Sequence, residues 1–454
     1  MTPPVRKLGG VTFPVLDLFA GVGGFHAALT AMGGEVVQAA EIDDAASAVY
    51  ERTWGLRPDR DVVDLASDPA TKVKPHSLLA GGFPCQPFSK SGRQLGISEE
   101  RGRLFDHVVK ILQVHTPPVV ALENVRNIAG PRQRHVWRHV VDSLRSVGYA
   151  TPDEPTVFSP HLLPPWLGGG PQARDRVHIL GTYVGRAQAA RLRPEPVVRR
   201  RPVDGWDPRK WDITELLEPD HTIDGVQRLR LTTDEQQWVD VWNDLLDRLG
   251  DVELPGFPLW STYWHDGAVV DSTAPGWKQA FEAKNIAFYN DNRRAVRAWL
   301  HRQETRLRGF PASRQKLEWQ AQDSPRDLRA CLLQFRPSGI RAKKPTYAPA
   351  LVAMNQTPVI GPRGRRLSPV EAARLQGFDD NLAFDGQADT QAYKQLGNAV
   401  HVGTMFYVVR EHVLRDAAHI AAQPGGSLLV ESVRAAPQAH VPSWWQRATI
   451  QRAG

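Results

Sequence analysis

The residue best suited to chemistry in this chain is Cys85, one of only two cysteines among 454 residues. It lies between Pro84 and Pro87 in the run Gly82–Ser89 (GFPCQPFS), which predicts a stiff loop entered through a glycine. Each proline fixes its own φ angle and biases the preceding residue towards an extended backbone. A nucleophile that must meet a substrate atom at a set angle benefits from such a loop. A lone cysteine is, however, often a small buried hydrophobic residue, so this loop alone leaves both readings open.

Composition limits the classes of protein to which the chain can belong. It is 41% hydrophobic and 23% charged, as soluble globular proteins are, and its length predicts about two or three domains. No apolar run is long enough to span a membrane, and the N-terminal residues do not resemble a signal peptide. Two cysteines cannot build a disulfide framework or a zinc finger, so we expect a cytoplasmic protein without a metal. The net charge of +7 modestly favours a polyanionic partner such as nucleic acid.

Strands and helices are expected to alternate in the first third of the chain. The predicted strands cover 11–20, 35–40, 77–79 and 118–122, and the predicted helices cover 25–32, 45–54, 104–115 and 136–147. This alternation is typical of an α/β fold with a doubly wound parallel sheet, which binds ligands at the carboxyl ends of its strands. Gly21, Glu41, Cys85 and Glu123 all follow predicted strands, so we expect them to meet at one edge.

The pattern changes near residue 185. Arginine, proline and tryptophan become frequent and the alternation is lost until about residue 347, which predicts a separate, irregular domain with helices over 235–249 and 295–307. A helix over 369–376 follows, with Ser368 as its N-cap and Gly377 ending it. Prolines and glycines beyond residue 422 predict a linker and a loose tail.

Several short motifs follow one another in a set order. They are Asp17–Gly24 (DLFAGVGG), Glu41 at a strand end, the loop around Cys85, Glu123–Val125 (ENV), Pro171–Arg176 (PQARDR), Arg374–Phe378 (RLQGF) and Gln395–Val400 (QLGNAV). In type and order these motifs closely resemble those of DNA (cytosine-5)-methyltransferases of bacterial restriction–modification systems. The resemblance covers about residues 13–182 and 337–410.

The resemblance implies a Rossmann-like, S-adenosylmethionine-dependent methyltransferase sheet with a smaller, irregular target-recognition domain. We expect the catalytic domain over 1–185 and the target-recognition domain, including the helix ending at Phe378, over 186–384. A returning helix over 385–422 would complete the catalytic domain, and 423–454 would be a flexible tail.

The chemistry implied by the resemblance needs a thiolate and an acid. The Cys85 thiolate would add to carbon 6 of cytosine, so that carbon 5 can take a methyl group from S-adenosylmethionine, leaving S-adenosylhomocysteine. Glu123, at an apolar strand end that should raise its pKa, would act at ring nitrogen N3. Arg174 and Arg176 alternate, so on a strand both would point to one face, and the resemblance implies that they face the active site.

The resemblance also assigns binding positions. Those for the cofactor are Phe19, Ala20, Gly21, Val22, Gly23, Gly24, Glu41, Ile42, Asp61, Val62, Pro84, Leu104, Asn398 and Val400. Those for the DNA substrate are Phe83, Pro84, Asn124, Val125, Gln172, Arg336, Arg341, Lys343 and Lys344. Asp64 is an alternative to Asp61, and Ala399 stands where the family often has serine.

The target base lies inside a DNA duplex, so such an enzyme must flip its cytosine out of the stack. We expect a monomer that acts on double-stranded DNA, with a cognate restriction endonuclease as its genetic partner. Alternatives are an RNA cytosine-5 methyltransferase of the same family and a non-catalytic DNA-binding member. The first should carry Cys-Phe-Thr in the variable region, where this chain has Cys331-Leu332-Leu333, and the second should have lost Cys85 or Glu123.

Overall fold

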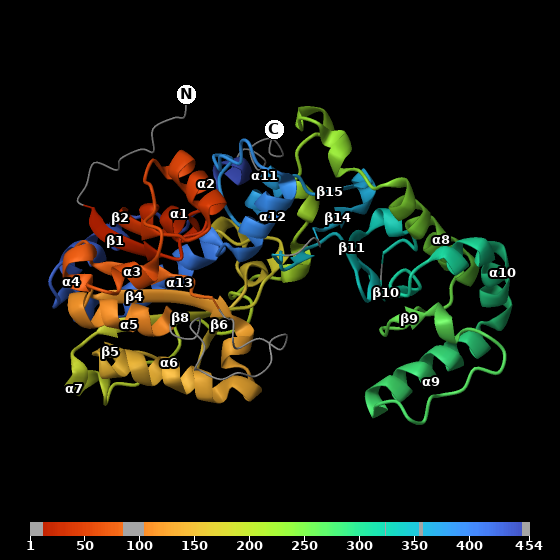
Figure 1. The fold of residues 1–454 in the computed structure, drawn as a ribbon, viewed down its shortest axis with the longest axis horizontal. Coiled ribbons are helices and arrows are strands. Elements are labelled where there is room, and N and C mark those ends of the chain that lie inside the picture. Colours follow the sequence, from red (N-terminus) through yellow and green to blue (C-terminus); the bar gives the residue numbers. More distant parts are fainter. Residues whose placement is uncertain (1–11, 85–103, 323, 354–356, 447–454) are drawn as a thin grey trace. The chain divides into compact units, whose positions relative to one another are not determined.

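The computed structural model describes residues 12–84, 104–322, 324–353 and 357–446, which fall into two compact units (Figure 1). Unit 1 comprises Met1–Trp211, Pro349–Ala353 and Pro369–Gly454. Unit 2 comprises Asp212–Ala348 and Met354–Ser368. No helix among the described residues is both long enough and apolar enough to cross a bilayer.

This division differs from the sequence-based boundaries at two places. Residues 186–211 belong to unit 1, because the indoles of Trp206 and Trp211 both donate hydrogen bonds to the carbonyl of His161 (2.9 and 3.0 Å). The segment Arg374–Phe378 also belongs to unit 1 rather than to the second domain. Its Gln376 is fully buried there.

The centre of unit 1 is a seven-stranded sheet in the order β2-β1-β3-β4-β8-β5, with β6 also paired to β8, among the described residues. The strands are β1 (Phe13–Leu18), β2 (Gly34–Ala40), β3 (Leu78–Gly81), β4 (Val119–Val125), β5 (Tyr149–Ala150), β6 (Thr156–Phe158) and β8 (Arg176–Tyr183). The first four in the order are parallel, and β8 runs antiparallel to β4, β5 and β6. The predicted α/β sheet is therefore confirmed, and the predicted helix over 104–115 matches α5.

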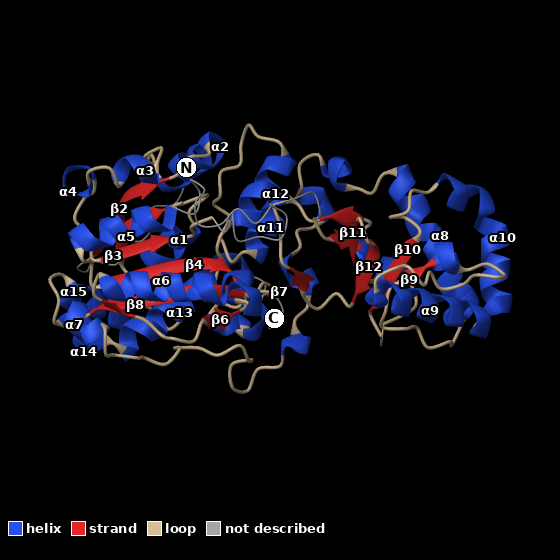
Figure 2. Ribbon diagram, turned by 60° about the horizontal axis from the view of Figure 1, so that its bottom comes forward, coloured by secondary structure: helices blue, strands red, loops and turns tan. Residues whose placement is uncertain are grey.

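Helices cover both faces of this sheet (Figure 2). One face packs on α3 (Val62–Leu65), α5 (Leu104–His115) and α6 (Arg134–Ser146), whose apolar residues join those of the strands in one core. The other face is covered by α1 (Gly24–Thr30), α13 (Val402–Arg415), α14 (Ala417–Ala421) and α15 (Gly426–Ala435). The remaining helices of the unit are α2 (Asp44–Trp54), α4 (Pro69–Lys72), α7 (Arg186–Ala189), α11 (Pro369–Leu375) and α12 (Asp389–Asn398). The short strand β7 (Gln172–Ala173) lies just before β8 in the chain.

Unit 2 is more regular than the sequence predicts. Its described residues form a six-stranded sheet in the order β15-β14-β11-β12-β10-β9. The strands are β9 (Leu259–Trp260), β10 (Lys316–Gln320), β11 (Leu332–Arg336), β12 (Gly339–Lys343), β14 (Val359–Ile360) and β15 (Arg365–Arg366). Its helices are α8 (Thr233–Leu249), α9 (Gly276–Asp291) and α10 (Arg293–Gly309). The sequence analysis did not predict this sheet, because strands of two to five residues leave little periodic signal in a sequence.

Tryptophan fills the core of unit 2. Trp242, Trp264 and Trp299 are buried against one another, with ring centroids 5.3 to 6.1 Å apart. The Trp242 indole donates a hydrogen bond to the carbonyl of Arg314 (2.9 Å). Trp238 belongs to the same core and is 5% exposed.

The tail is not loose over its described part. Helix α15 packs against α13 and β1, and Trp444 is buried with its indole hydrogen-bonded to the carbonyl of Phe378 (2.9 Å). Prolines 437 and 442 therefore shape an ordered segment, which the sequence alone could not distinguish from a linker.

Truncation of a core tryptophan tests the packing of unit 2. Trp242→Ala should lower the free energy of unfolding by about 3–5 kcal/mol, because it leaves a cavity among the tryptophan rings. The matched control is Trp277→Ala on α9, where the side chain is 64% exposed and the change should stay within ~0.5 kcal/mol. Chemical denaturation followed by circular dichroism measures both. Equal effects of the two substitutions would contradict this account of the core.

Candidate active site

The register of the parallel strands brings the predicted residues to one edge of the sheet. Leu18 pairs with Ala40 on one side and with Gly81 on the other, and Gly81 pairs with Leu122. The next residues along the chain are Phe19, Glu41, Gly82 and Glu123, and they leave the sheet at the same level. The predicted convergence is therefore confirmed for these strand ends. Cys85, three residues beyond Gly82, lies outside the described residues.

The glycine turn after β1 is bound to the end of β2. Glu41 accepts hydrogen bonds from the backbone N–H of Gly21 and, through its other oxygen, of Asp43 (both 2.8 Å). Burial raises the pKa of Glu41, and these backbone donors oppose that shift. Gly21 and Gly23 have φ angles of 55° and 93°, in the region that favours glycine. A Cβ on Gly23 would lie 2.1 Å from the Trp54 indole nitrogen, so no larger residue fits there.

Apolar side chains remain accessible beside this turn. Ile42 is 70% exposed and Phe19, with a φ angle of 54°, is half-buried. Asp61 caps α3 by accepting a hydrogen bond from the Val63 N–H (2.8 Å). The alternative, Asp64, is instead paired with Lys72 at 2.6 Å.

The segment after α12 closes on the same turn. A Cβ on Gly24 would come within 2.7 Å of Val400, so the two segments are in close contact. Asn398 at the end of α12 is exposed, and Val400 is buried. Leu104, the first residue of α5 and a predicted cofactor position, is half-buried. Tight glycines, a paired carboxylate and accessible apolar side chains fit a nucleoside-containing cofactor such as S-adenosylmethionine.

Glu123 is paired with Arg176 across the β4–β8 ladder. The Arg176 Nε lies 2.8 Å from Glu123 Oε1, and the two side chains are 16% and 10% exposed. Burial raises the pKa of Glu123, although Arg176 and then Arg174 lower it in part. The carboxyl therefore holds its proton to higher pH than an ordinary glutamate does.

Arg174 has surroundings quite unlike those of Arg176. The expectation that one continuous strand carries both is wrong, because β7 ends at Ala173 and β8 begins at Arg176. The Arg174 guanidinium donates hydrogen bonds to the carbonyls of Leu351, Gly397 and Ala399 (2.8 to 2.9 Å), and the residue is 2% exposed. Burial lowers its pKa to about 9. Its contacts are those of a side chain that holds backbone in place.

Two predicted substrate residues also bond to backbone. Asn124 donates a hydrogen bond to the carbonyl of Phe83 (3.0 Å), two residues before Cys85. Gln172 was expected to contact DNA but is fully buried. It donates to the carbonyl of Leu375 (2.9 Å) and accepts from the Leu351 N–H (3.1 Å). Val125 is 37% exposed at the end of β4, and Pro84 is exposed at the edge of the described residues.

Sequence reasoning missed two buried residues that support the site. Ser159 accepts a hydrogen bond from the Arg174 N–H (2.8 Å), and Gln376 donates to the carbonyl of Leu396 (2.5 Å). Gln376 lies within the RLQGF motif, so its position carried a signal, but Ser159 lies in no motif.

The predicted DNA-contacting residues of unit 2 lie mainly on one face of its sheet. Glu318 of β10 pairs with Arg336 of β11 (3.1 Å) and Arg341 of β12 (2.9 Å). The strand register places Lys343 on the same face as Arg341, with its ammonium 4.7 Å from the Tyr347 ring centroid. Burial lowers the pKa of both Arg336 and Lys343. Lys344 follows the end of β12 and falls outside this alternation.

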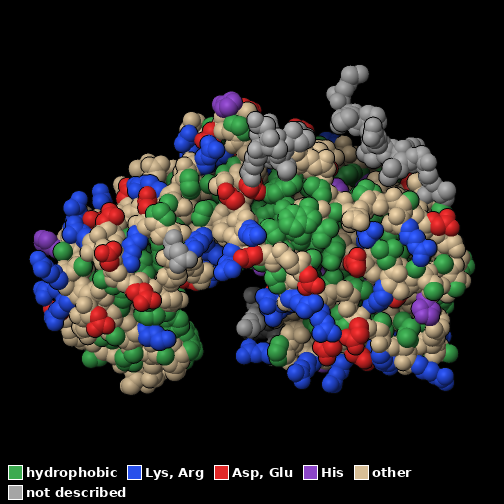
Figure 3. Space-filling view, turned by 180° about the vertical axis from the view of Figure 1, so that it is seen from behind, with side chains coloured by type: hydrophobic (Ala, Val, Ile, Leu, Met, Phe, Trp, Pro, Cys, Tyr) green, Lys and Arg blue, Asp and Glu red, His purple; other side chains and the backbone are tan. Residues whose placement is uncertain are grey.

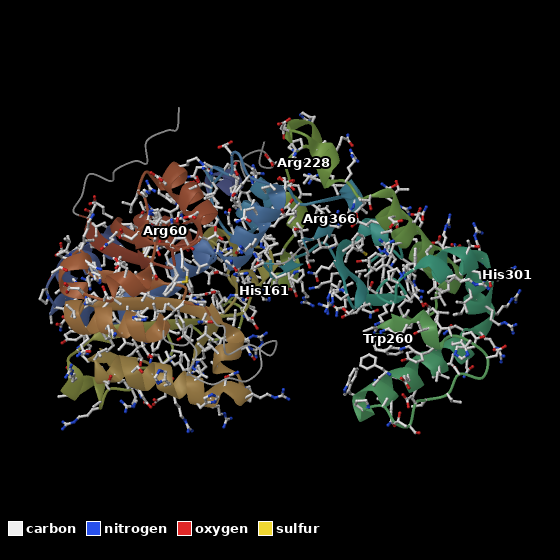
Figure 4. The ribbon with its side chains drawn as sticks, in the orientation of Figure 1. Arg60, His161, Arg228, Trp260, His301 and Arg366 are labelled. Carbon is white, nitrogen blue, oxygen red and sulfur yellow. The ribbon has the colours of Figure 1, made fainter. Side chains whose placement is uncertain are left out.

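This face continues to the edge of the sheet. Lys316 and Trp260 are register partners, and the Lys316 ammonium lies 4.6 Å from the Trp260 ring centroid. Trp260 is labelled in Figure 4. The opposite face of the sheet carries the apolar residues of the core, such as Leu317, Leu333 and Ile340. Elsewhere on the visible surface, lysine and arginine side chains are mixed with acidic ones (Figure 3). Strand alternation thus places Lys316, Arg336, Arg341 and Lys343 on the same face of the sheet.

The family model that matches the chain is that of the C-5 cytosine-specific DNA methylases, over residues 13–413. The chain is 40% identical to the Type II methyltransferase M.AluI of Cellulosimicrobium cellulans, over 93% of this chain and 96% of that protein. It is 34% identical to the Type II methyltransferase M.HhaI of Haemophilus parahaemolyticus, over 38% of this chain and 50% of that protein. It is 29% identical to M.NgoBI of Neisseria gonorrhoeae, over 66% of this chain and 83% of that protein.

Most of the chain, including every strand end that forms the site, lies within the matched range. The strand register, the buried Glu123–Arg176 pair and the glycine turn bonded to Glu41 stand at the positions of the motifs. The chain belongs to the family of C-5 cytosine-specific DNA methylases.

Proposed function

We propose that this methyltransferase modifies one cytosine within a specific short sequence of duplex DNA, after flipping that base out of the helix. The observation that carries the proposal is the buried Glu123–Arg176 pair at the same sheet edge as the glycine turn that binds Glu41. An acid and a cofactor pocket at the edge where the chain leaves the sheet towards Cys85 are what methylation of carbon 5 requires.

Cys85 acts as the nucleophile. Its thiolate adds to carbon 6 of the cytosine, which makes carbon 5 nucleophilic. The cofactor would supply the methyl group for carbon 5 and leave as S-adenosylhomocysteine. The proton on carbon 5 would pass to water as the thiolate leaves and the ring is restored. Asn124 supports the approach of this loop by holding the carbonyl of Phe83.

Glu123 supplies the proton at ring nitrogen N3. Burial raises its pKa, so the acid form persists to higher pH than in an ordinary glutamate and can provide a proton as the thiolate adds. Arg176, whose Nε is 2.8 Å from the carboxyl, orients Glu123 and adds positive charge beside the base. Positive charge of this kind also favours a thiolate nearby.

Arg174 serves the site by position. It fixes Gly397 and Ala399, on either side of Asn398, so it sets the shape of the segment that closes the cofactor pocket. Gln172 fixes Leu351 and Leu375 in the same way. We therefore assign to these two residues a positioning role instead of a contact with the base.

The cofactor is S-adenosyl-L-methionine, which supplies an activated methyl group when bound. Phe19 and Ile42 offer apolar surface to the adenine, Glu41 takes the ribose hydroxyls, and Gly21–Gly24 admit the methionine portion. Asp61 is better placed than Asp64 to contact the adenine, because Asp64 is held by Lys72.

Unit 2 reads the DNA sequence. The sheet face with Arg336, Arg341 and Lys343 presents guanidinium and ammonium groups that suit guanine edges and phosphates. Glu318 holds both guanidiniums in fixed orientations, which favours bidentate contacts. Lys344 would add a phosphate contact.

The biological setting is a bacterial restriction–modification system. The Type II relatives support a modification role. In this proposal the protein is a cytoplasmic monomer, with a restriction endonuclease of the same specificity as its genetic partner. Methylation protects the site that such a nuclease would cut.

Removal of the thiol tests the nucleophile. Cys85→Ala should bind cofactor and DNA but methylate no cytosine, as judged by bisulfite sequencing of DNA from expressing cells. The matched control is Cys331→Ala in the core of unit 2, where burial raises the pKa of the thiol to about 12 and keeps it protonated. This control should retain activity. Methylation by Cys85→Ala would overturn the mechanism.

Replacement of the acid should alter both rate and pH dependence. Glu123→Gln should lower kcat about 100- to 10,000-fold, because an amide cannot transfer the proton. In the wild type, kcat should fall as pH rises through the raised pKa of Glu123, since the acid form is lost there. The variant should lack that alkaline decline. Asp175→Asn, which removes a carboxylate paired with Arg126 and Arg200, is the control, and an unchanged pH profile in Glu123→Gln would remove the assignment.

A sheet-face arginine tests the recognition role of unit 2. Arg341→Ala should weaken binding to DNA that carries the recognition sequence by ~1–3 kcal/mol. It should also reduce the preference for that DNA over scrambled DNA. Arg308→Ala on α10, where the side chain is 79% exposed, removes the same charge from the same unit and should leave that preference intact. Binding of both DNAs at two salt concentrations separates base reading from phosphate attraction. Equal preference in both variants would place recognition elsewhere.

A further inference from the structure

We infer that residues 440–446, here called the C-terminal strap, position the cofactor-closing segment 397–402 and so control affinity for the cofactor. The inference rests on the proposed function only in identifying that segment as part of the cofactor pocket. The strap lies beyond residue 413, where the match to the family model ends, so the family resemblance assigns nothing to it.

The strap is bound to the turn that follows α11. The Trp444 indole donates to the carbonyl of Phe378 (2.9 Å), and the Ser443 N–H and hydroxyl both donate to Asp379 Oδ1 (2.7 Å each). The guanidinium of Arg374 lies 5.7 Å from the Trp444 ring centroid. Trp444 is 6% exposed, so this contact is a packed one.

The turn after α11 is hydrogen-bonded at both ends of the segment 397–402, to the residue before it and to its last residue. Gln376, next to the residues that the strap holds, donates to the carbonyl of Leu396 (2.5 Å) and accepts from the Val402 N–H (3.0 Å). A Cβ on Gly377 would come within 3.1 Å of the His401 ring, so the turn also packs on the segment itself. Displacement of the turn would therefore move Asn398 and Val400.

A second route leads from Trp445 to the same segment. Its ring packs edge-on against Trp211 at 5.6 Å, and the Trp211 indole donates to the carbonyl of His161 (3.0 Å). His161 Nδ1 is bonded to the Ser159 hydroxyl (2.8 Å), which accepts the Arg174 N–H (2.8 Å).

Arg174 in turn binds the carbonyls of Gly397 and Ala399. Both strap tryptophans thus lead to segment 397–402 by separate sets of contacts. If the strap only stabilised unit 1, there would be no reason for both sets of contacts to end at the segment that closes the cofactor pocket.

Substitution of Trp444 tests the inference by direct binding. Trp444→Ala should raise the Kd for S-adenosylmethionine, measured by calorimetry, about fivefold or more, because a buried hydrogen bond and its packing are lost. It should raise KM for the cofactor similarly while leaving kcat at saturating cofactor near the wild-type value. Trp444→Phe, which keeps a ring but loses the N–H, should show a smaller rise.

The control is Val430→Ala in α15, a buried position that also lies beyond residue 413, on a helix that packs against α13, α14 and β1. It should lower the melting temperature without changing the Kd. An unchanged Kd in Trp444→Ala, or an equal rise in Val430→Ala, would overturn the inference.

If Trp444→Ala does not fold, Ser443→Ala provides the same test, since it removes the hydroxyl bond to Asp379 at a more exposed site. Because binding is measured without DNA, the result is independent of whether the protein methylates the proposed substrate. Tight cofactor binding by a wild type that modifies no cytosine would refute the proposed function and leave the strap testable.

Discussion

The candidate site depends on the pairing of Leu18, Ala40, Gly81 and Leu122 in one row of the parallel sheet, because Phe19, Glu41, Gly82 and Glu123 follow them and leave the sheet together. A shift of one residue in any strand would turn its side chains to the other face, since the side-chain period of a strand is two. Gly81 shows how tightly the row is packed, because a Cβ there would lie 2.9 Å from the Leu18 carbonyl oxygen. Buried apolar residues on both faces of the sheet fix this row. The loops that follow it can therefore carry polar and charged residues without disturbing the sheet.

Buried charge is tolerated at this edge because each charged group has specific partners. Glu123 has Arg176, and Glu41 has two backbone N–H groups, so neither carboxyl is left without compensation. Burial still outweighs these partners and raises the pKa of both. The burial that makes the charged form of Glu123 costly thus also favours its protonated form, as the proposed proton transfer requires.

Much of unit 1 could be predicted from the sequence, and much of unit 2 could not. Helix α5 coincides with the predicted range 104–115, because an apolar stripe at helical spacing survives in any context. The sheet of unit 2 was missed because β9, β14 and β15 have two residues each, and because β9 and β14 pair with β10 and β11, which are distant in the chain. Propensity carries no information on such pairing, which depends on tertiary contacts. The buried Trp444 was missed for the same reason, since its partner Phe378 is 66 residues away.

The site residues show the same difference between what the sequence predicts and what tertiary contacts decide. Residue type was enough to single out Glu123, but it could not separate Arg174 from Arg176, which share a motif and differ in every contact. Alternation would put both on one face if the strand were continuous, yet β8 begins only at Arg176. The break frees Arg174 to bind three carbonyls from distant parts of the chain, while Arg176 stays in the ladder opposite Val125. The motif Pro171–Arg176 therefore contacts Glu123 through Arg176 and the segment 397–402 through Arg174. A shift of this motif would move both Glu123 and that segment.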